Sequence, residues 1–225
     1  MDIDIVSLRM GAEDFRYLLG RGYPRGNSLD LVGNRYSLRK DERDLLHRGV
    51  FAPSVAAARR GKLLELEEIG GYRLGVDGYN VLITVEAALC QKPLIVADDG
   101  FIRDISGISS AHRMRDLTLQ VVDFVLEVLS DASPKEVVFL FDSPISKSGD
   151  LARHVADRLK AVGLLGESRA VKVPERTLIG YDGVVSTSDS AIIDQVEKAV
   201  DLAGYVIRNR VANPWLIELC ALERP

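Results

Sequence analysis

The sequence changes character at residue 72, and the pattern that follows most limits the possible folds. Short apolar runs rich in β-branched residues alternate with segments whose apolar residues recur at helical spacing. In chain order the runs are YRLGVD, PLIVAD, EVVFLFD, SRAVKV, GVVSTSD and GYVIRN. Regular alternation of strand and helix predicts an α/β domain with a mainly parallel central sheet flanked by helices.

Three of the segments between these runs are amphipathic. In residues 116–129 one stripe is apolar and the opposite stripe is acidic, and residues 150–163 and 188–204 repeat this arrangement. We therefore expect a helix over each of these three ranges.

The chain before residue 71 reads differently. Residues 12–65 suggest short helices without strands, and Gly70-Gly71 is a linker signal. We expect an N-terminal helical, arginine-rich region over 1–70 and the α/β domain over 71–225. Residues 1–65 hold 12 Lys and Arg against 9 Asp and Glu, whereas residues 66–225 hold 17 against 24. A positive appendage suits an anionic polymer, and an acidic body suits a metal.

Several other classes of protein are disfavoured by the sequence. No apolar run reaches the roughly 18 residues of a spanning helix, and the acidic start MDIDIVSLRM does not resemble a signal peptide. Cys90 and Cys220 lie in apolar, helix-like segments, so we expect small buried side chains in a reducing compartment. We expect a cytoplasmic protein that does not bind membranes, with homo-oligomers left open.

Aspartates close four of the predicted strands. They are Asp77, the pair Asp98 and Asp99, Asp142, and Asp189. The carboxyl ends of parallel strands share one edge of a sheet, where ligands bind, so we expect these acids to converge. A single aspartate at a strand end is usually a turn or helix-cap residue. Four on one edge would repel one another unless a cation offset their charge.

Mg²⁺ and Mn²⁺ favour oxygen ligands and can activate water for attack on a phosphodiester. The pattern therefore predicts one or two such ions held by Asp77, Asp99, Asp142 and Asp189.

Further residues near the predicted edge have two interpretations each. Asn80 either caps the following helix or donates a hydrogen bond that holds Asp77 or a metal-bound water. Ser146, Lys147 and Ser148 precede a helix, where they either bind a backbone phosphate or form a capped loop. The candidates for a supporting shell are Asp98, Asp104, Ser188 and Asp194. For Asp194 we favour an ion pair with Lys198, and for Glu86 we favour solvation.

The arginines also have two interpretations. Arg103 follows the DDG turn and could contact phosphate near the acids. Arg21, Arg25, Arg35 and Arg39 either bind a nucleic-acid backbone or form the solvated face of a small helical cap, and we favour the cap.

The motifs VDGYN, FLFD and STSDSAIID resemble those of the NYN branch of the PIN-like nuclease superfamily, over roughly residues 72–210. The resemblance implies an Mg²⁺ or Mn²⁺ site for RNA cleavage, with Asp77, Asp142 and Asp189 at the acidic motifs and Asn80 at the Asn of the first. The superfamily's second acid could be Glu86 or one of Asp98, Asp99 and Asp104. Ser190 stands where a second acid often follows the last motif, which leaves metal count and activity open.

The segments RGYPRGNSLDLVGNRYSLRKDER, DDGFIRDISG and DSPISKSG also resemble a prokaryotic, largely archaeal family of uncharacterised proteins. Members of that family pair an N-terminal helical region with a PIN-like domain. Three functions are consistent with these observations: a metal-dependent ribonuclease acting as an endonuclease, a catalytically silent RNA-binding or assembly module, and a small-molecule phosphohydrolase. We expect the first.

Overall fold

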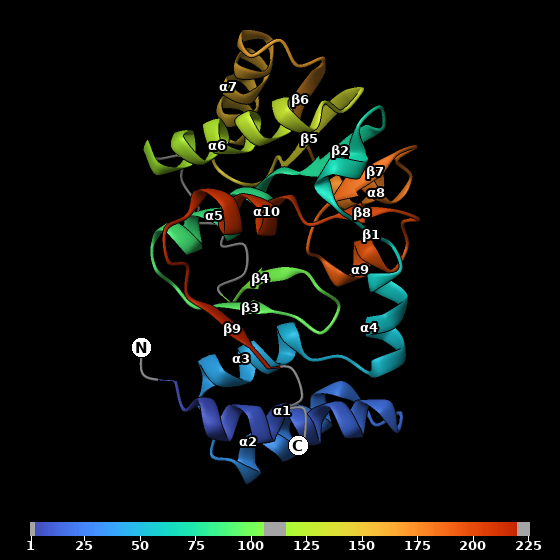
Figure 1. Cartoon of the computed structure of the whole chain (residues 1–225), viewed down its shortest axis with the longest axis vertical. Coiled ribbons are helices and arrows are strands. Elements are labelled where there is room, and N and C mark those ends of the chain that lie inside the picture. Colours follow the sequence, from blue (N-terminus) through green and yellow to red (C-terminus); the bar gives the residue numbers. More distant parts are fainter. Residues whose placement is uncertain (1–2, 106–115, 220–225) are drawn as a thin grey trace. The chain divides into compact units, whose positions relative to one another are not determined.

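The structure is a computed structural model that describes residues 3–105 and 116–219. The described chain divides into two compact units, each considered by itself (Figure 1). The first unit comprises residues 3–61, 93–105 and 215–219. The second comprises residues 62–92 and 116–214.

A six-stranded sheet forms the centre of the second unit. Its strand order is β1-β8-β7-β2-β5-β6, and every neighbouring pair is parallel (Figure 1). The strands are β1 (Leu63–Leu64), β2 (Arg73–Asp77), β5 (Glu136–Asp142), β6 (Gly166–Val171), β7 (Val184–Ser186) and β8 (Ala199–Val200). The predicted α/β class with a mainly parallel sheet is confirmed.

Helices flank this sheet. They are η1 (Leu66–Ile69), α5 (Gly78–Leu89), α6 (Asp116–Ala132), α7 (Ser148–Ala161), α8 (Pro174–Ile179), α9 (Ser190–Ile193) and α10 (Leu202–Arg210). Helices α5, α6 and α10 pack against one another, and α8 packs against β2 and β5. The run Val137–Phe141 of β5 is buried throughout, as expected for a strand covered on both faces.

Strand β2 is the point at which the strand order reverses. After β2 the chain places β5 and β6 on one side of it, and later places β7 and β8 on the other side. In open parallel sheets, ligands bind outside the carboxyl ends of the strands at such a switch point. The end of β2 is Asp77.

The first unit joins four helices to a small three-stranded sheet. The helices are α1 (Ile5–Gly20), α2 (Arg25–Arg35), α3 (Lys40–Gly49) and α4 (Pro53–Arg60), and the strands are β3 (Leu94–Val96), β4 (Ile102–Asp104) and β9 (Leu216–Glu218). Strand β3 lies in the middle, antiparallel to β4 and parallel to β9. One apolar core includes Leu8 and Phe15 of α1, Leu45 of α3, Ile95 of β3 and Ile217 of β9.

This arrangement corrects one strand prediction. The run PLIVAD was expected to belong to the central parallel sheet, but β3 pairs with β4 and β9 instead. Residues 93–105 and 215–219 therefore group with the N-terminal helices, whereas residues 62–70 group with the α/β unit. The grouping differs in this way from the expected division at residue 70. The physical reason is that Ile95 packs into the helical core, where Gly49 leaves room for it.

Two further predictions near the C-terminus are wrong. Residues 188–204 do not form one helix, because the apolar pair Ala199–Val200 joins the sheet as β8 between α9 and α10. The run GYVIRN is not a strand, because it lies inside α10. Asp201 caps α10 by accepting a hydrogen bond from the Gly204 amide at 2.9 Å, which favours helix over strand there.

None of the helices in residues 3–105 and 116–219 combines the length and apolar character needed to cross a bilayer. Cys90, expected to be buried, is exposed at the C-terminal end of α5. Cys220 lies outside the described residues.

Two glycines near helix starts test the packing at the end of β2. A methyl group on Gly78 would overlap the ring of Phe141, whereas a methyl group on Gly149 would meet nothing within 4 Å. We expect Gly78→Ala to lower the free energy of unfolding by about 1–3 kcal/mol through overpacking. Gly149→Ala is the matched control and should leave it unchanged or raise it by up to about 1 kcal/mol. Urea unfolding of both variants measures the difference, and equal stabilities would contradict the packing described here.

Candidate functional site

Asp77 occupies the middle of the carboxyl edge of the sheet, between β5 and β7. Its side chain is buried. The Thr187 hydroxyl donates to Asp77 Oδ2 at 2.9 Å, and the Asn80 amide donates to Asp77 Oδ1 at 3.4 Å. Asp77 is therefore the N-cap of α5 as well as the last residue of β2. The turn-forming and site-forming interpretations of this residue describe the same geometry.

Asn80 connects two segments of the edge. It lies within the first turn of α5, and its side-chain oxygen accepts hydrogen bonds from the Ser188 amide at 2.8 Å and the Ser188 hydroxyl at 3.0 Å. Of the two interpretations of Asn80, the helix cap is wrong, because Asp77 is the N-cap of α5. The side chain instead holds the segment after β7 against the start of α5.

Asp189 follows β7 and is exposed. Its Oδ1 accepts a hydrogen bond from the Ala191 amide at 2.7 Å and so caps α9. Its own amide donates to the Thr187 hydroxyl oxygen at 3.1 Å. Thr187 thus links Asp189 to Asp77 through one oxygen atom, which fixes the backbone between the two acids.

Asp142 ends β5 on the other side of β2. It is half-buried, and its strand partner in β6 is Val171. Burial raises the pKa of Asp142, and the charge of Glu175 in the first turn of α8 raises this pKa further. Glu175 therefore lies close enough to contribute to the same acidic edge.

The strongest electrostatic effect falls on Asp77. Burial raises its pKa to about 7, and the charges of Asp142 and Asp189 add to this effect, while the hydrogen bonds from Thr187 and Asn80 oppose it. The structure therefore brings Asp142 and Asp189 within electrostatic reach of Asp77. A cation would relieve the repulsion and would displace the proton from Asp77.

The donor set fits a hard divalent cation that keeps most of its water. Asp77, Asp142, Asp189 and Glu175 offer carboxylate oxygens, and one or two carboxylates with waters suffice for Mg²⁺. In the described ranges, no three His, Cys, Asp or Glu side chains stand arranged as a ready-made metal cage. Mg²⁺ or Mn²⁺ would therefore be held by few protein ligands here.

Sequence reasoning missed two acids of this edge. Glu175 lies in a short helix that begins at Pro174. Asp201 is the N-cap of α10 and lies within a range that was predicted to be one long helix. Asp77, Thr187 and Asp201 each follow directly after the mutually paired residues Val76, Ser186 and Val200. The sequence signal for Asp201 was the apolar pair Ala199–Val200 that precedes it. This pair forms a strand only because β7 lies beside it.

Asp98, Asp99 and Asp104 belong to the first unit, so the prediction that Asp98 and Asp99 close a strand of the central sheet is wrong. Asp99 is fully buried and pairs with Arg103 at 2.6 Å and Arg59 at 3.2 Å. Asp98 accepts two hydrogen bonds from Arg16, at 2.7 and 2.8 Å. These carboxylates hold arginines of their own unit, and Arg103 is itself a buried partner in that network.

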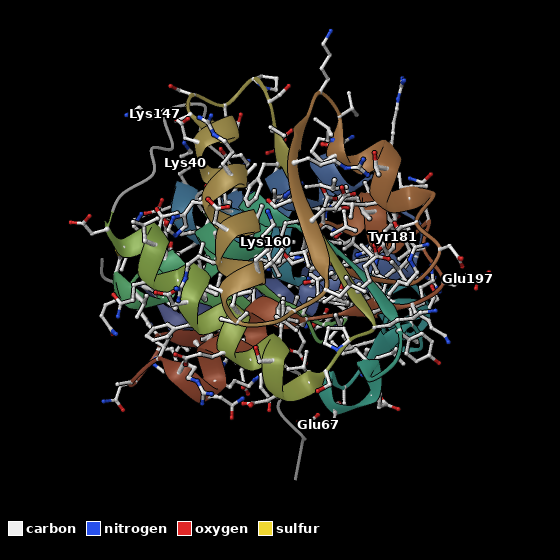
Figure 2. The ribbon with its side chains drawn as sticks, turned by 90° about the horizontal axis from the view of Figure 1, so that it is seen from above. Lys40, Glu67, Lys147, Lys160, Tyr181 and Glu197 are labelled. Carbon is white, nitrogen blue, oxygen red and sulfur yellow. The ribbon has the colours of Figure 1, made fainter. Side chains whose placement is uncertain are left out.

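The predicted phosphate loop before α7 is only partly available. Lys147 adopts a left-handed conformation with φ 65°, and Lys147 and Lys160 lie near the two ends of α7 (Figure 2). Ser146 and Lys147 are exposed, but Ser148 is buried and its hydroxyl donates to the Ser143 carbonyl at 3.3 Å. Ser148 therefore stabilises the loop, whereas Ser146 and Lys147 remain candidates for phosphate contact.

The N-terminal arginines mostly serve the first unit. Arg35 pairs with Asp14 at 3.4 Å, Arg39 pairs with Glu42 at 3.1 Å, and Arg21 stacks on Tyr17. Arg25 is half-buried against Phe15 and Phe51. The contacts of Arg21, Arg35 and Arg39 agree with the favoured interpretation, in which they form the solvated face of a helical cap. Arg25 differs from these three because it is half-buried against aromatic rings.

Two of the expected arrangements involve other contacts in the structure. Asp194 is exposed at the end of α9, and Lys198, its expected partner, donates to the Tyr72 hydroxyl at 3.0 Å. Glu86 accepts a hydrogen bond from Thr118 at 2.5 Å, which joins α5 to α6.

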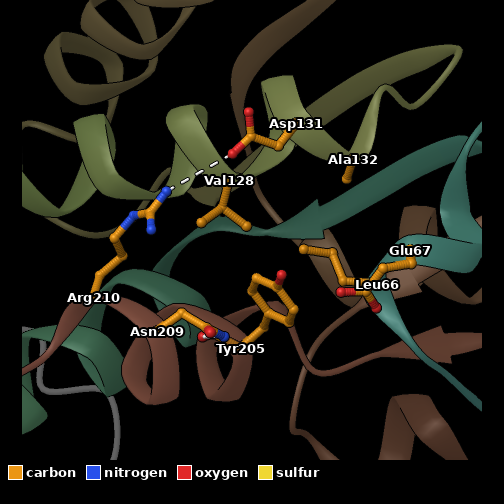
Figure 3. A pocket seen from close by; sticks show the side chains of 8 residues that line it. All are labelled: Leu66, Glu67, Val128, Asp131, Ala132, Tyr205, Asn209 and Arg210. Atoms are coloured by element: carbon orange, nitrogen blue, oxygen red, sulfur yellow. Dashed lines mark hydrogen bonds and ion pairs between the residues drawn. The ribbon is translucent and has the colours of Figure 1, made fainter.

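A pocket of about 270 Å³ lies at the other end of the second unit (Figure 3). Its lining includes Glu67 of η1, Asp131 of α6, and Tyr205 and Arg210 of α10. Arg210 reaches toward Asp131 at 3.8 Å. Because η1 and the end of α6 lead into β2 and β5, the pocket borders the amino ends of the strands, opposite the edge where ligands bind in such sheets.

The raised pKa of Asp77 has a testable effect on stability. The folded-state value, about 7, exceeds the ordinary 3.8, so the folded protein holds this proton more tightly than the unfolded chain. The contribution of Asp77 to the free energy of unfolding should therefore fall as pH rises from about 4 to about 7 and then level off. Asp77→Asn removes this titrating group. With chelator present, we expect its free energy of unfolding to rise by about 2–4 kcal/mol relative to that of the native protein across that range.

Urea unfolding at pH 5 and pH 8 measures this gain. Asp182→Asn, an exposed aspartate at the opposite end of β7, is the control and should show no pH-dependent difference. A constant difference between Asp77→Asn and the native protein at both pH values would contradict the assigned electrostatics.

The role of Asp99 is tested by the same method. Asp99→Asn leaves Arg59 and Arg103 buried with less compensating charge, so we expect a loss of about 3–5 kcal/mol. A metal ligand would instead give a variant whose stability is unchanged in chelator. Asp30→Asn, exposed in the same unit, should change stability by less than about 0.5 kcal/mol.

Comparison with known proteins identifies the family. Residues 66–205 match the model described as "Domain of unknown function (DUF5616)", and residues 7–62 match "Protein of unknown function (DUF434)". "Uncharacterized protein MJ0935" of Methanocaldococcus jannaschii is 32% identical over 204 residues, which cover 90% of this chain and 97% of the relative. No solved structure matches the chain. The matched range 66–205 contains every acid of the edge described above, and the chain belongs to the DUF5616 family.

Proposed function

We propose that this protein is a metal-dependent ribonuclease that hydrolyses phosphodiesters at the carboxyl edge of the central sheet. The observation that carries the proposal is the convergence of Asp77, Asp142 and Asp189 at the switch point of a parallel sheet. Burial raises the pKa of Asp77 to about 7, and the charges of Asp142 and Asp189 add to this effect. A divalent cation offsets such repulsion better than any side chain near these acids.

The ligands of this cation would be Asp77 and Asp142, with Asp189 and Glu175 binding it directly or through water. Bound Mg²⁺ or Mn²⁺, one ion or two, supplies Lewis-acid activation of water and neutralises charge on the phosphodiester. The chain's own contribution is positioning. The Thr187 hydroxyl orients Asp77 Oδ2. The Asn80 side chain holds Ser188 and so keeps the next residue, Asp189, at the edge where Asp77 lies.

Ionisation of Asp77 also governs when the site can form. A carboxyl group with a pKa of about 7 keeps its proton in part at neutral pH, and the proton competes with the cation for the same oxygens. Cation affinity in this proposal therefore rises with pH up to about 7.

RNA is the proposed substrate because VDGYN, FLFD and STSDSAIID resemble NYN-type PIN-like nucleases. Exposed Ser146 and Lys147 follow β5 on the same edge as Asp142, where they are placed to contact the RNA backbone. Arg21, Arg35 and Arg39 are paired or stacked within the first unit, so the proposal assigns them no contact with RNA. The proposal places the protein in the cytoplasm, where its RNA substrate is present.

A catalytically silent RNA-binding module is the second candidate. Two observations favour it: Asp189 uses one oxygen to cap α9, and Ser190 stands where a second acid often follows. In this alternative the acidic edge binds a cation without turnover.

The test is RNA cleavage by the native protein and by Asp77→Asn and Asp142→Asn. We expect Mg²⁺- or Mn²⁺-dependent cleavage by the native protein, its abolition by chelator, and a loss of about 100-fold or more in each variant. Asp182→Asn is the control and should cleave normally. Cleavage that persists in Asp77→Asn or in chelator would overturn the mechanism, and metal-dependent RNA binding without cleavage would favour the silent module.

A further inference from the structure

Three arginine side chains gather around one aromatic ring in the first unit. The guanidinium carbons of Arg59, Arg25 and Arg103 lie 4.4, 4.9 and 5.2 Å from the centre of the Phe51 ring. The arginines come from α4, α2 and β4, which are far apart in sequence. Phe51 itself is buried between α3 and α4. A ring of like charges at this spacing needs compensation.

Two aspartates supply part of that compensation. Asp99 is shared between Arg103 and Arg59 and is completely buried. Asp98 receives the bidentate contact of Arg16 and also accepts a hydrogen bond from the Phe51 amide at 3.0 Å. Asp104 neighbours Arg103 on β4, and the alternation of a strand directs it to the other face. The cluster thus holds four arginines and two aspartates.

Among the four arginines of this cluster, Arg25 alone makes no ion pair with a carboxylate of the described residues. It stacks on Phe15 and Phe51 and donates a hydrogen bond to the His47 carbonyl in the last turn of α3. Burial and the charges of Arg59 and Arg103 lower the pKa of Arg25 to about 10. The local environment therefore disfavours its positive charge, even after the contributions of Asp98 and Asp99.

A bound anion would remove this imbalance. The guanidinium fork matches a phosphate group, and two parallel N–H···O bonds to phosphate are stronger than neutral hydrogen bonds. Arg25 is only half-buried, so part of its side chain remains open to solvent. We propose that Arg25, supported by the positive charge of Arg59 and Arg103, forms a phosphate-binding site in the first unit. All of the groups of this site lie in the first unit.

The phosphate could be free in solution or belong to an RNA backbone, and both present the same oxygens to Arg25. The two sources differ in affinity. A backbone phosphate brings further contacts from the polymer, so a short single-stranded RNA should bind more tightly than inorganic phosphate and lose affinity more steeply with salt.

The experiment measures binding of inorganic phosphate and of a short single-stranded RNA to the full chain by calorimetry, with chelator present to prevent cleavage. We expect both probes to bind the native protein. Arg25→Gln should lower the affinity for each probe by roughly tenfold or more. Arg35→Gln is the matched control, because Arg35 lies on the same helix but is exposed and paired with Asp14. It should bind like the native protein.

Unchanged binding in Arg25→Gln, an equal loss in Arg35→Gln, or failure of the native protein to bind either probe would overturn the proposal. Tighter binding of RNA than of phosphate identifies the backbone as the source, and equal or weaker binding identifies free phosphate. If Arg25→Gln does not fold, the side-chain Nε–H resonance of Arg25 in the native protein provides the test: it should shift on addition of phosphate, whereas that of Arg35 should not.

Because chelator is present throughout, this result does not depend on whether the acidic edge cleaves RNA. Binding at Arg25 together with no cleavage in the separate Mg²⁺ or Mn²⁺ assay would keep this site and remove the ribonuclease proposal, whereas cleavage in that assay with no binding at Arg25 would do the reverse.

Discussion

Burial of a carboxyl group at the end of the central strand is the constraint on which the acidic edge depends. Asp77 must follow β2, cap α5 and accept the hydroxyl of Thr187 at once, so its position is fixed by two neighbouring elements. The cost is a charge held away from water beside two other acids. The sheet geometry enforces this cost, because parallel strands direct the residues that follow them to the same edge.

Charge is handled differently in the two units. In the first, buried carboxylates are matched by arginines, and Asp99 has two of them. At the edge of the second unit, burial raises the pKa values of Asp77 and Asp142, and the charges of neighbouring acids raise them further. A structural role explains the first pattern, the pairing of carboxylates with arginines, and the remaining imbalance in the first unit is that of Arg25. The second pattern stores an imbalance that a cation can relieve, which is why it carries the functional proposal.

The alternation of strand and helix was readable from the sequence because parallel sheets covered on both faces need continuous apolar runs. The meeting of Asp77, Asp142 and Asp189 followed from the same rule. The membership of PLIVAD in a sheet was not readable, because an apolar run does not specify its partner strand. The same limit hid Asp201: Ala199–Val200 is too short to identify as a strand without β7 beside it. Electrostatic pairing also could not be predicted from the sequence, since it depends on which side chains meet after folding.

The most direct test of the central claim is a crystal structure of the protein soaked in Mn²⁺, with anomalous scattering used to locate the ion. We predict a peak at the carboxyl edge within coordination distance of Asp77 and Asp142. A peak elsewhere, or none at saturating Mn²⁺ and a pH above 7, would contradict the account.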